Sequence, residues 1–238
     1  MAGRQARPRL RPFAPLLDEN DTQFWGSDYP PVAVSLLTSA VACFAKRGFD
    51  ATTTRDIGIG AGLSTAALYV HFSSKEDLLF TIMSIGHERA LDALMPAALL
   101  DGDDGDPVVA LSDLVKRFVT WHTHHTAVGR ICQYEVSALT PERYGQITVM
   151  RNRITDVFRH AVTRGIAAGV FDADDVNQVV RVIIYTAIDV VRWYRADGPL
   201  SSEDLADLYA NLALRMLGAA QPALRELNRD PAHLGRRR

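Results

Sequence analysis

Side chains that can donate hydrogen bonds to phosphate groups are concentrated between residues 53 and 75 of this 238-residue chain. They are the hydroxyl groups of Thr53, Ser64 and Thr65, the phenol of Tyr69, the imidazole of His71 and the ammonium group of Lys75. Such donors position a nucleic-acid backbone without reading its sequence. Thr65, Ala66 and Ala67 are too short for bidentate base contacts and favour apolar contact with thymine methyl groups. These residue types therefore predict contact with duplex DNA.

Two short helices joined by a turn are needed to position these side chains. Thr53 with Asp56 three residues later has the spacing of a capping box, which predicts a helix over residues 55–60. A glycine-containing turn follows over residues 61–64, and a second helix over residues 65–72. This is the geometry of a helix-turn-helix, which lays its second helix in the major groove. An ordinary pair of short helices with a glycine turn has the same pattern.

Apolar residues recur at helical spacing on both sides of this pair. One helix is predicted over residues 31–47 with Gly48 as its stop, and another from Ser74 to about Met95. After an acidic break, further helices are predicted over residues 108–125, 128–139, 142–168, 175–194 and 202–217. No run alternates as a strand does. The fold class expected is all-α, with about nine helices and an N-terminal three-helix helix-turn-helix domain.

Changes in composition divide the chain into four segments. Residues 1–30 are rich in proline and charge and are expected to form a mobile arm. Residues 31–78 form the expected DNA-binding domain, residues 79–218 a larger domain for ligand binding and dimerisation, and residues 219–238 a C-terminal tail. The arginines of the first segment are either solvated or grip phosphate, and the sequence leaves both open.

The overall charge limits how the chain can bind nucleic acid. With 26 Lys and Arg against 28 Asp and Glu, the net charge is −2, so DNA contact must be local. Cys43 and Cys132 lie too far apart to suggest a disulfide framework, which favours a cytoplasmic location. No stretch reaches the roughly 18 apolar residues that a membrane span needs.

Four stretches together carry a family resemblance. They are Thr53-Thr54-Arg55-Asp56-Ile57, Ala61-Gly62-Leu63-Ser64, Leu68-Tyr69-Val70-His71-Phe72 and Ser74-Lys75-Glu76-Asp77-Leu78-Leu79. The region from 31 to 91 resembles the N-terminal domain of TetR/AcrR transcriptional regulators. The resemblance implies that residues 64–72 form the recognition helix, with Tyr69, His71 and Lys75 facing DNA, and we also place Thr54 and Arg55 at this surface.

Two departures from the family pattern concern the helix pair. Gly58 and Gly60 stand where the family often has alanine, and each is expected to loosen its helix by up to about 1 kcal/mol. Thr65-Ala66-Ala67 replaces a common Lys-Gly-Thr, which leaves the operator sequence open.

The C-terminal half carries a fainter resemblance. Gly165-Ile166, Gly169-Val170-Phe171, Val191-Arg192-Trp193-Tyr194-Arg195, Gly198-Pro199-Leu200-Ser201 and Tyr209 resemble TetR-type repressors of steroid and fatty-acid breakdown. Several of these respond to acyl-CoA thioesters, so the resemblance implies a similar effector.

An acyl-CoA site needs cations for phosphates and an apolar channel for the acyl chain. The candidates for the cations are Arg130, Arg151, Arg153 and Arg159, and those for the channel are Tyr134, Phe158, Ile184 and Trp193. Solvated arginines and ordinary core aromatics are the alternative reading for each of them.

The last two predicted helices are more apolar than surface helices need to be, which predicts a homodimer with a four-helix interface. The interface candidates are Val180, Ile183, Ala187, Val191, Leu205, Leu208, Leu212 and Met216. A two-fold dimer carries two recognition helices and predicts a palindromic operator.

Other functions find little support in the residues. No nucleophile elbow or glycine-rich phosphate loop is present, so no enzyme activity is expected. His122 and His125 share a helical face without cysteine or acidic partners, and the acidic segment 101–107 lacks EF-hand spacing, so no metal or cofactor is expected. The expected function is a ligand-released repressor. The alternative is a dimeric DNA-binding protein without an effector.

Overall fold

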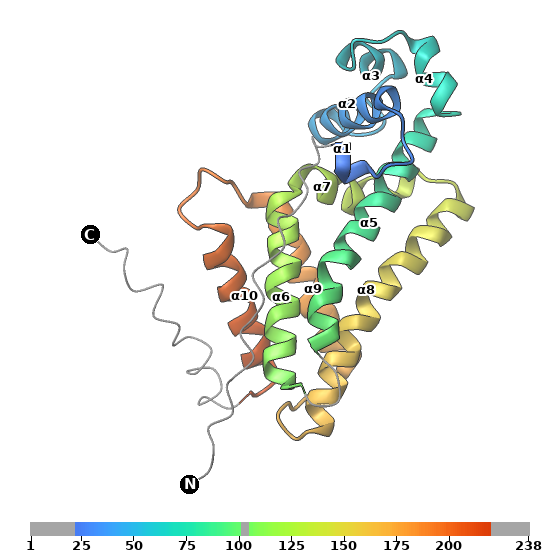
Figure 1. Ribbon diagram of the computed structural model, residues 1–238. Helices are drawn as coiled ribbons and strands as arrows, with labels where there is room; N and C mark the ends of the chain where they lie inside the picture. Colours follow the sequence, from blue (N-terminus) through green and yellow to red (C-terminus); the bar gives the residue numbers. More distant parts are fainter. Residues whose placement is uncertain (1–21, 101–104, 220–238) are drawn as a thin grey trace.

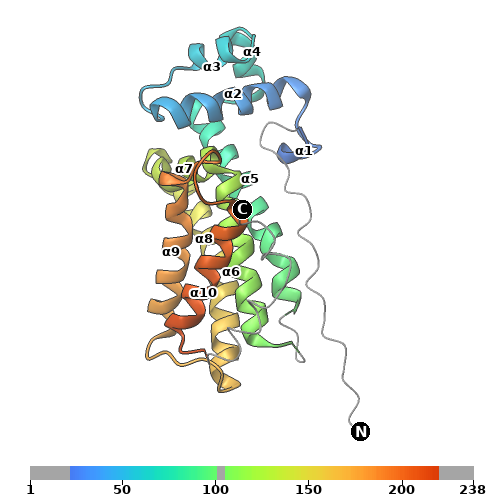
Figure 2. The ribbon, with the colours of Figure 1, turned by 90° about the vertical axis from the view of Figure 1, so that its left-hand side faces the viewer.

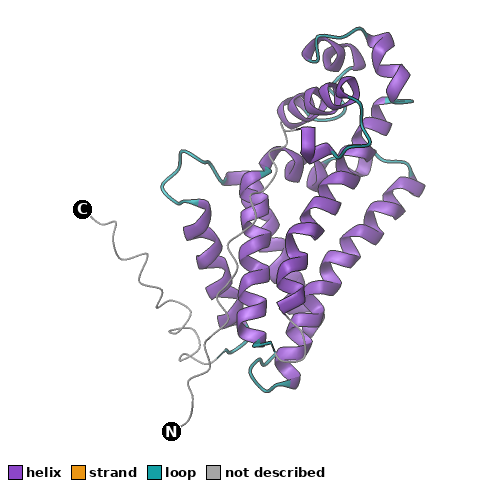
Figure 3. Ribbon diagram, viewed as in Figure 1, coloured by secondary structure: helices purple, strands orange, loops and turns teal. Residues whose placement is uncertain are grey.

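The computed structural model describes residues 22–100 and 105–219, and these form helices and loops without a strand (Figure 3). The helices are α1 (Thr22–Trp25), α2 (Pro31–Arg47), α3 (Thr54–Gly60), α4 (Thr65–His71), α5 (Lys75–Leu100), α6 (Pro107–His124), α7 (Thr126–Tyr134), α8 (Pro141–Ala167), α9 (Val176–Trp193) and α10 (Ser202–Met216), with a 3₁₀ turn η1 (Val136–Ala138). The expected all-α class is confirmed.

Two parts stacked along one axis make up the molecule (Figures 1 and 2). Helices α2, α3 and α4 form one end, and α5 runs from that end into a bundle with α6 to α10. Helix α6 is the centre of the bundle and packs against α5, α8, α9 and α10. Helix α2 rests on α7, so the two parts share an interface.

Local sequence signals set most helix ends. Pro31 occupies the first turn of α2, where its missing N–H costs nothing, and Lys46 and Arg47 lie in the last turn. Gly48 then takes a positive φ of 80°, and its N–H donates to the Phe44 carbonyl at 2.8 Å. Asp106, Asp175 and Ser201 each cap a helix with a side-chain oxygen, which sets the starts of α6, α9 and α10.

The expected mobile arm is too long at its C-terminal end. Phe24 and Trp25 in α1 are buried, and the Phe24 ring lies 5.1 Å from the His125 ring between centroids. Arg89 on α5 donates from Nε to the Phe24 carbonyl at 2.9 Å. Because two large aromatic residues enter the core, residues 22–30 belong to the folded unit. The rest of the predicted arm, and residues 220–238 of the predicted tail, lie outside the described residues.

Two predicted helix boundaries also differ. The helix expected over residues 128–139 divides into α7 and η1, because α7 ends at Tyr134 and Glu135 leaves helical geometry. Helix α5 continues past Met95 to Leu100 with Pro96 inside it. None of the helices in the described part of the chain is long and apolar enough to cross a membrane.

Candidate DNA-binding surface and internal cavity

Helices α3 and α4 begin with the side-chain caps that the sequence predicted. Thr53 Oγ1 accepts from the Asp56 N–H at 3.1 Å, and Asp56 Oδ2 accepts from the Thr53 N–H at 2.9 Å, which completes the capping box. The Thr53 hydroxyl lowers the pKa of the Asp56 carboxyl by hydrogen bonding to its ionised form. Ser64 Oγ accepts from the Ala67 N–H at 3.2 Å and starts α4.

Two glycines, Gly58 and Gly62, allow the tight turn between the two helices, and a third, Gly60, allows close packing of α3 on α2. Gly62 has a positive φ of 69°. A Cβ on Gly58 would lie 2.9 Å from the Leu63 carbonyl oxygen, and a Cβ on Gly60 would collide with the Ser39 hydroxyl. The two departures from the family's alanines are therefore positions of close approach, where the added methyl group meets its neighbours. Helix propensity alone does not describe them.

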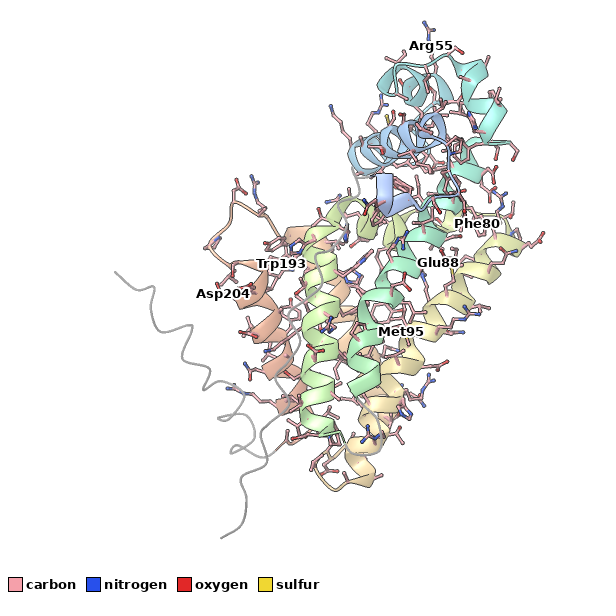
Figure 4. All side chains as sticks on the ribbon, in the orientation of Figure 1. Arg55, Phe80, Glu88, Met95, Trp193 and Asp204 are labelled. Carbon is pink, nitrogen blue, oxygen red and sulfur yellow. The ribbon has the colours of Figure 1, made fainter. Side chains whose placement is uncertain are left out.

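One face of the pair is open to solvent. Arg55 points away from the body of the molecule at its far end (Figure 4), and Ala66, Tyr69, Val70 and His71 are exposed on α4. Thr54, Thr65 and Ala67 are half-buried beside them. Val70, 78% exposed, was not among the predicted contacts. Its position four residues after Ala66, on the same helical face, could have identified it.

Lys75 differs from its predicted role. Its ammonium group donates to the carbonyls of Phe49 at 2.7 Å and Thr52 at 2.8 Å, and it lies 4.0 Å from the centre of the Phe49 ring. Two of its three hydrogens are thus used to fasten the α2–α3 loop to the start of α5. Lys75 therefore stabilises the packing of the domain. The predicted contact with a DNA phosphate can involve only the third hydrogen of its ammonium group.

An arginine on α8 joins the bundle to the start of α5. Arg143 contacts Glu76 Oε2 and Asp77 Oδ1 through its two Nη atoms, each at 2.6 Å. Asp77 Oδ2 in turn accepts from the Ser73 N–H at 2.9 Å, directly after the recognition helix. Burial opposes ionisation of Asp77, but Ser73 and Arg143 outweigh it and hold the pKa of the carboxyl below its ordinary value. Helix α8 is therefore tied to the end of α4.

A cavity of about 500 Å³ lies inside the bundle between α5, α6, α7, α8 and α9. Phe118, Trp121 and His122 line it on α6 and are buried. Arg159 on α8 and Arg181 on α9 also line it, where the Arg159 side chain is 43% exposed and Arg181 is exposed. The cavity lining thus combines buried aromatic rings with exposed guanidinium groups, and it is in the size range of sites for small organic ligands. Arg159 is also paired with Asp156 and donates from Nε to Asn177 Oδ1 at 3.0 Å.

Three of the eight residues predicted for the ligand site line this cavity, namely Arg151, Arg159 and Ile184. Phe158 packs with its ring 5.3 Å from the cavity residue Phe118. The other four do not line it, and one of them is Arg153, which is exposed on α8. Arg130 is exposed on α7, Tyr134 lines a separate hollow beside Tyr209, and Trp193 is 47% exposed at the end of α9 that leads into the loop to α10 (Figure 4). The sequence analysis missed Arg181, which lies one turn before Tyr185 in α9.

The histidines of this region are buried. His87 and His122 line the cavity, and burial lowers the pKa of each imidazole to about 4, so both are neutral at pH 7. Arg151 donates from Nε to His87 Nε2 at 3.4 Å and from Nη2 to the Cys132 carbonyl. Within residues 22–100 and 105–219, no three His, Cys, Asp or Glu side chains gather as metal ligands.

Five of the eight predicted interface residues point into their own protomer. Val180, Ile183, Ala187, Val191 and Leu205 are each at most 3% exposed, so they cannot contact a partner, and this part of the prediction is wrong. They belong to the core because α9 and α10 pack on α6. Leu208, Leu212 and Met216 are 45–47% exposed, and Val182 and Tyr185 are exposed on α9.

Comparison with known proteins agrees with these two parts. Residues 36–82 match the model of bacterial regulatory proteins of the tetR family, and residues 104–217 match the tetracyclin repressor-like C-terminal domain. The HTH-type transcriptional repressor KstR2 of Mycobacterium tuberculosis is 34% identical over 183 residues, which cover 75% of this chain and 89% of KstR2. The chain belongs to the TetR family.

Solved structures of TetR-family proteins share its fold. A regulatory protein from Rhodococcus RHA1 aligns with a TM-score of 0.76 and 34% identity over 81% of this chain and all of that one. The structure of KstR2, described as a ketosteroid transcriptional regulator, has a TM-score of 0.71 over 79% of this chain and 96% of that chain. AibR in complex with isovaleryl coenzyme A and operator DNA has a TM-score of 0.69 over 76% of this chain and 97% of that chain, at 22% identity, which shows the fold alone. This TetR-family chain is a helix-turn-helix transcriptional regulator.

Proposed function

We propose that this TetR-family regulator is a homodimeric repressor that leaves a palindromic operator when an amphiphilic anion, such as an acyl-CoA or steroid-CoA ester, enters its cavity. The observation that carries this proposal is the cavity of about 500 Å³, whose lining includes the aromatic rings of Phe118 and Trp121 and the guanidinium groups of Arg159 and Arg181. Apolar rings favour a hydrocarbon group, and guanidinium groups favour phosphate or carboxylate.

The volume sets how such a ligand would fit. About 500 Å³ accommodates an acyl or ring system but not a complete CoA ester. The nucleotide part would therefore lie outside, on the side of Arg159 and Arg181. Two related structures support this class of ligand. KstR2 is described as a ketosteroid transcriptional regulator, and AibR was solved in complex with isovaleryl coenzyme A.

The proposed dimerisation is supported by the surface of α9 and α10. Leu208, Leu212 and Met216 recur every four residues and form an exposed apolar stripe on α10, and Val182 and Tyr185 are exposed on α9. A second copy of the same surface related by a two-fold axis would bury both stripes and form a four-helix interface. Two recognition helices on one face then match a palindrome.

Ligand and DNA would communicate through α8. Arg151 lines the cavity, and Arg143 lies eight residues earlier on the same helix, about 12 Å away along the axis. A ligand that moves α8 would move Arg143 and with it the start of α5 and the recognition helix. Crystal structures with and without ligand that keep the same separation of the two recognition helices would rule this out.

The decisive experiment is selection of genomic DNA fragments with the purified protein, repeated with free fatty acids, acyl-CoAs and steroid-CoA esters. We expect a palindrome that one ligand class removes, because a ligand that prefers one state must shift the equilibrium. Enrichment that no ligand changes would favour the alternative, an effector-independent DNA-binding protein. Failure to enrich any sequence would contradict the proposal.

The arm before α1 needs a separate test. Deletion of residues 1–20 leaves Phe24 and Trp25 in place. If the arm grips phosphates, the deletion reduces operator affinity and lowers the slope of log affinity against log salt by about 0.9 for each lost contact. An unchanged slope assigns operator binding to the described domain.

A further inference from the structure

A backbone carbonyl determines the tautomer of His122, one of the two histidines that line the cavity. His122 Nδ1 lies 2.7 Å from the Phe118 carbonyl oxygen. A carbonyl oxygen only accepts, so Nδ1 carries the proton. The imidazole is neutral, because burial lowers its pKa to about 4. The remaining nitrogen, Nε2, therefore presents a lone pair and can only accept a hydrogen bond.

The His122 ring is held in place by its surroundings. The rings of Phe118 and Trp121 lie edge-on at 4.4 and 4.9 Å between centroids. Gly129 lies across from the imidazole, and a Cβ there would come within 3.6 Å of His122 Cδ2 and 2.9 Å of Val191 Cγ1. His122 itself is 6% exposed and lines the cavity. The direction of the lone pair is thus determined by packing.

No hydrogen-bond partner for Nε2 occurs among the residues that the structure describes. The second cavity histidine is different. His87 Nδ1 likewise lies 2.7 Å from the Met83 carbonyl, but its Nε2 accepts from Arg151 Nε at 3.4 Å. His87 Nε2 is therefore occupied by a protein donor, Arg151, whereas His122 Nε2 is available to a ligand in the cavity. His122 lines the cavity and its Nε2 is not among the fully buried atoms, so a ligand can reach this nitrogen, and a donor placed there adds a hydrogen bond to the complex.

We propose that the effector carries a hydroxyl group, or another neutral hydrogen-bond donor, that binds His122 Nε2 at the buried end of the cavity, with its anionic group at Arg159 and Arg181. This inference rests on the proposed function, because it names the chemistry of the ligand for the same cavity. A ketone at that point places a lone pair against a lone pair and is disfavoured. The site thus selects an alcohol over the matching ketone.

Small probes test the hydroxyl subsite apart from the rest of the ligand. Cyclohexanol, cyclohexanone and methylcyclohexane differ at one group and need no anionic contact. The full-length protein, labelled with ¹⁵N-histidine, is titrated with each, and the resonance of His122 is assigned as the one that His122→Gln loses. We expect cyclohexanol to shift the His122 Nε2 resonance and cyclohexanone and methylcyclohexane to leave it unchanged. If none of the three probes moves it, or the ketone moves it equally, the proposal is wrong.

Substitution at the acceptor gives a second readout. We expect cyclohexanol to bind the unaltered protein about tenfold more tightly than cyclohexanone, as for one hydrogen bond in a buried site. His122→Phe should remove this preference. His124→Phe is the matched control, because His124 contacts the Thr120 carbonyl in the same way but is exposed and does not line the cavity. A preference that persists in His122→Phe contradicts the assignment.

Failure of this inference and failure of the proposed function give different results. The probe shifts report on the cavity alone. Dodecanoyl-CoA, 11-hydroxydodecanoyl-CoA and 11-oxododecanoyl-CoA are then compared for release of operator DNA. Release by all three with equal strength would support a ligand-released repressor and overturn the hydroxyl subsite. An alcohol-specific shift without release by any ester would support the subsite and contradict this effector class.

Discussion

Single residues at the helix-turn-helix serve the fold and the surface together. The Thr53 hydroxyl donates to Asp56 Oδ2 at 2.7 Å, so it completes a cap and is not free for phosphate. Ser64 accepts from the Ala67 N–H and keeps its own proton for DNA. Arg55, Tyr69 and Val70 are exposed on the solvent-facing side of the helix-turn-helix, and their side chains take no part in helix capping. Capping therefore decides which of the predicted donors remain available.

Gly58→Ala tests whether close approach governs α3. The added methyl would lie 2.9 Å from the Leu63 carbonyl oxygen, so we expect the free energy of unfolding to fall by about 1–3 kcal/mol. Urea denaturation measures the change. Gly145→Ala is the control, because nothing lies within 4 Å of its Cβ position on α8 and alanine should stabilise the helix by up to about 1 kcal/mol. Equal gains in both variants would show that helix propensity decides at both sites.

Stability should fall in mild acid because of His87 and His122. Both imidazoles have pKa values lowered from 6.5 to about 4 by burial, so between these pH values the unfolded chain binds more protons. The contribution of these two neutral imidazoles to the free energy of unfolding is therefore complete above pH 6.5 and decreases as the pH falls towards 4. At pH 5 the loss is roughly 2 kcal/mol per histidine. Denaturant titrations at pH 5 and 7 measure this change.

The variant His122→Gln should lose about half of that pH dependence, whereas His124→Gln, at an exposed position, should keep it. An undiminished dependence in His122→Gln would assign the acid sensitivity to other groups.

At the scale of elements, α8 and α5 act as one connected unit. Arg143 on α8 pairs with Glu76 and Asp77 and lies 4.8 Å from the Phe80 ring centre on α5. Thr140, before α8, donates from its N–H to Glu76 Oε1 at 3.1 Å. Because Asp77 also caps the segment after α4, the recognition helix is held against the bundle through a few side chains. Because these contacts are partly exposed, we infer that they orient the recognition helix relative to the bundle more than they stabilise the fold.

Arg143→Gln should lower the ratio of operator affinity to non-specific DNA affinity by about fivefold, within the usual range for coupling between sites. Non-specific affinity and its salt dependence should stay the same, because no phosphate contact is lost. Binding curves on operator and scrambled duplexes measure both. Arg153→Gln is the control, on the same helix and exposed. A parallel loss on both duplexes would show that Arg143 contacts DNA or maintains the fold.

At the scale of the whole molecule, the two faces of α9 and α10 have separate uses. One face closes the core around α6, and the other presents Leu208, Leu212 and Met216. A hollow of about 380 Å³ is lined by Tyr134, Tyr185 and Tyr209, of which Tyr185 is also exposed on α9. The exposed apolar residues of α10 are those that the proposed interface between two copies would bury.

Leu212→Asp should convert the dimer to a monomer, since it places a charge in the middle of the apolar stripe. Size-exclusion chromatography with light scattering gives the mass, and affinity for a palindromic duplex should fall with it. The control variant is Val149→Asp on α8, which places the same charge at a similarly exposed aliphatic residue outside the stripe, and it should stay dimeric. A monomeric unaltered protein, or a dimeric Leu212→Asp protein, would contradict the proposed interface.

Helix identity and most helix ends follow from the sequence alone. Caps such as Thr53, Ser64 and Asp106, and the stop at Gly48, act within four residues, so a local pattern contains the whole interaction. The helix-turn-helix was predictable for the same reason, and so were the exposed Arg55, Tyr69 and His71, whereas Val70 was missed. Arg151, Arg159 and Ile184, which the sequence offered as ligand candidates, all line the cavity, and their contact with a ligand stays a prediction.

Tertiary structure decided what depends on contacts between distant segments. The partners of Lys75 lie 23 and 26 residues away, and α1 enters the core through Arg89, some 65 residues later. Helical periodicity shows that α9 and α10 carry two apolar faces, but both look alike in sequence. Packing on α6 selected Val180 and Leu205 for the core and left Leu212 outside, because burial is a property of the neighbours and not of the residue.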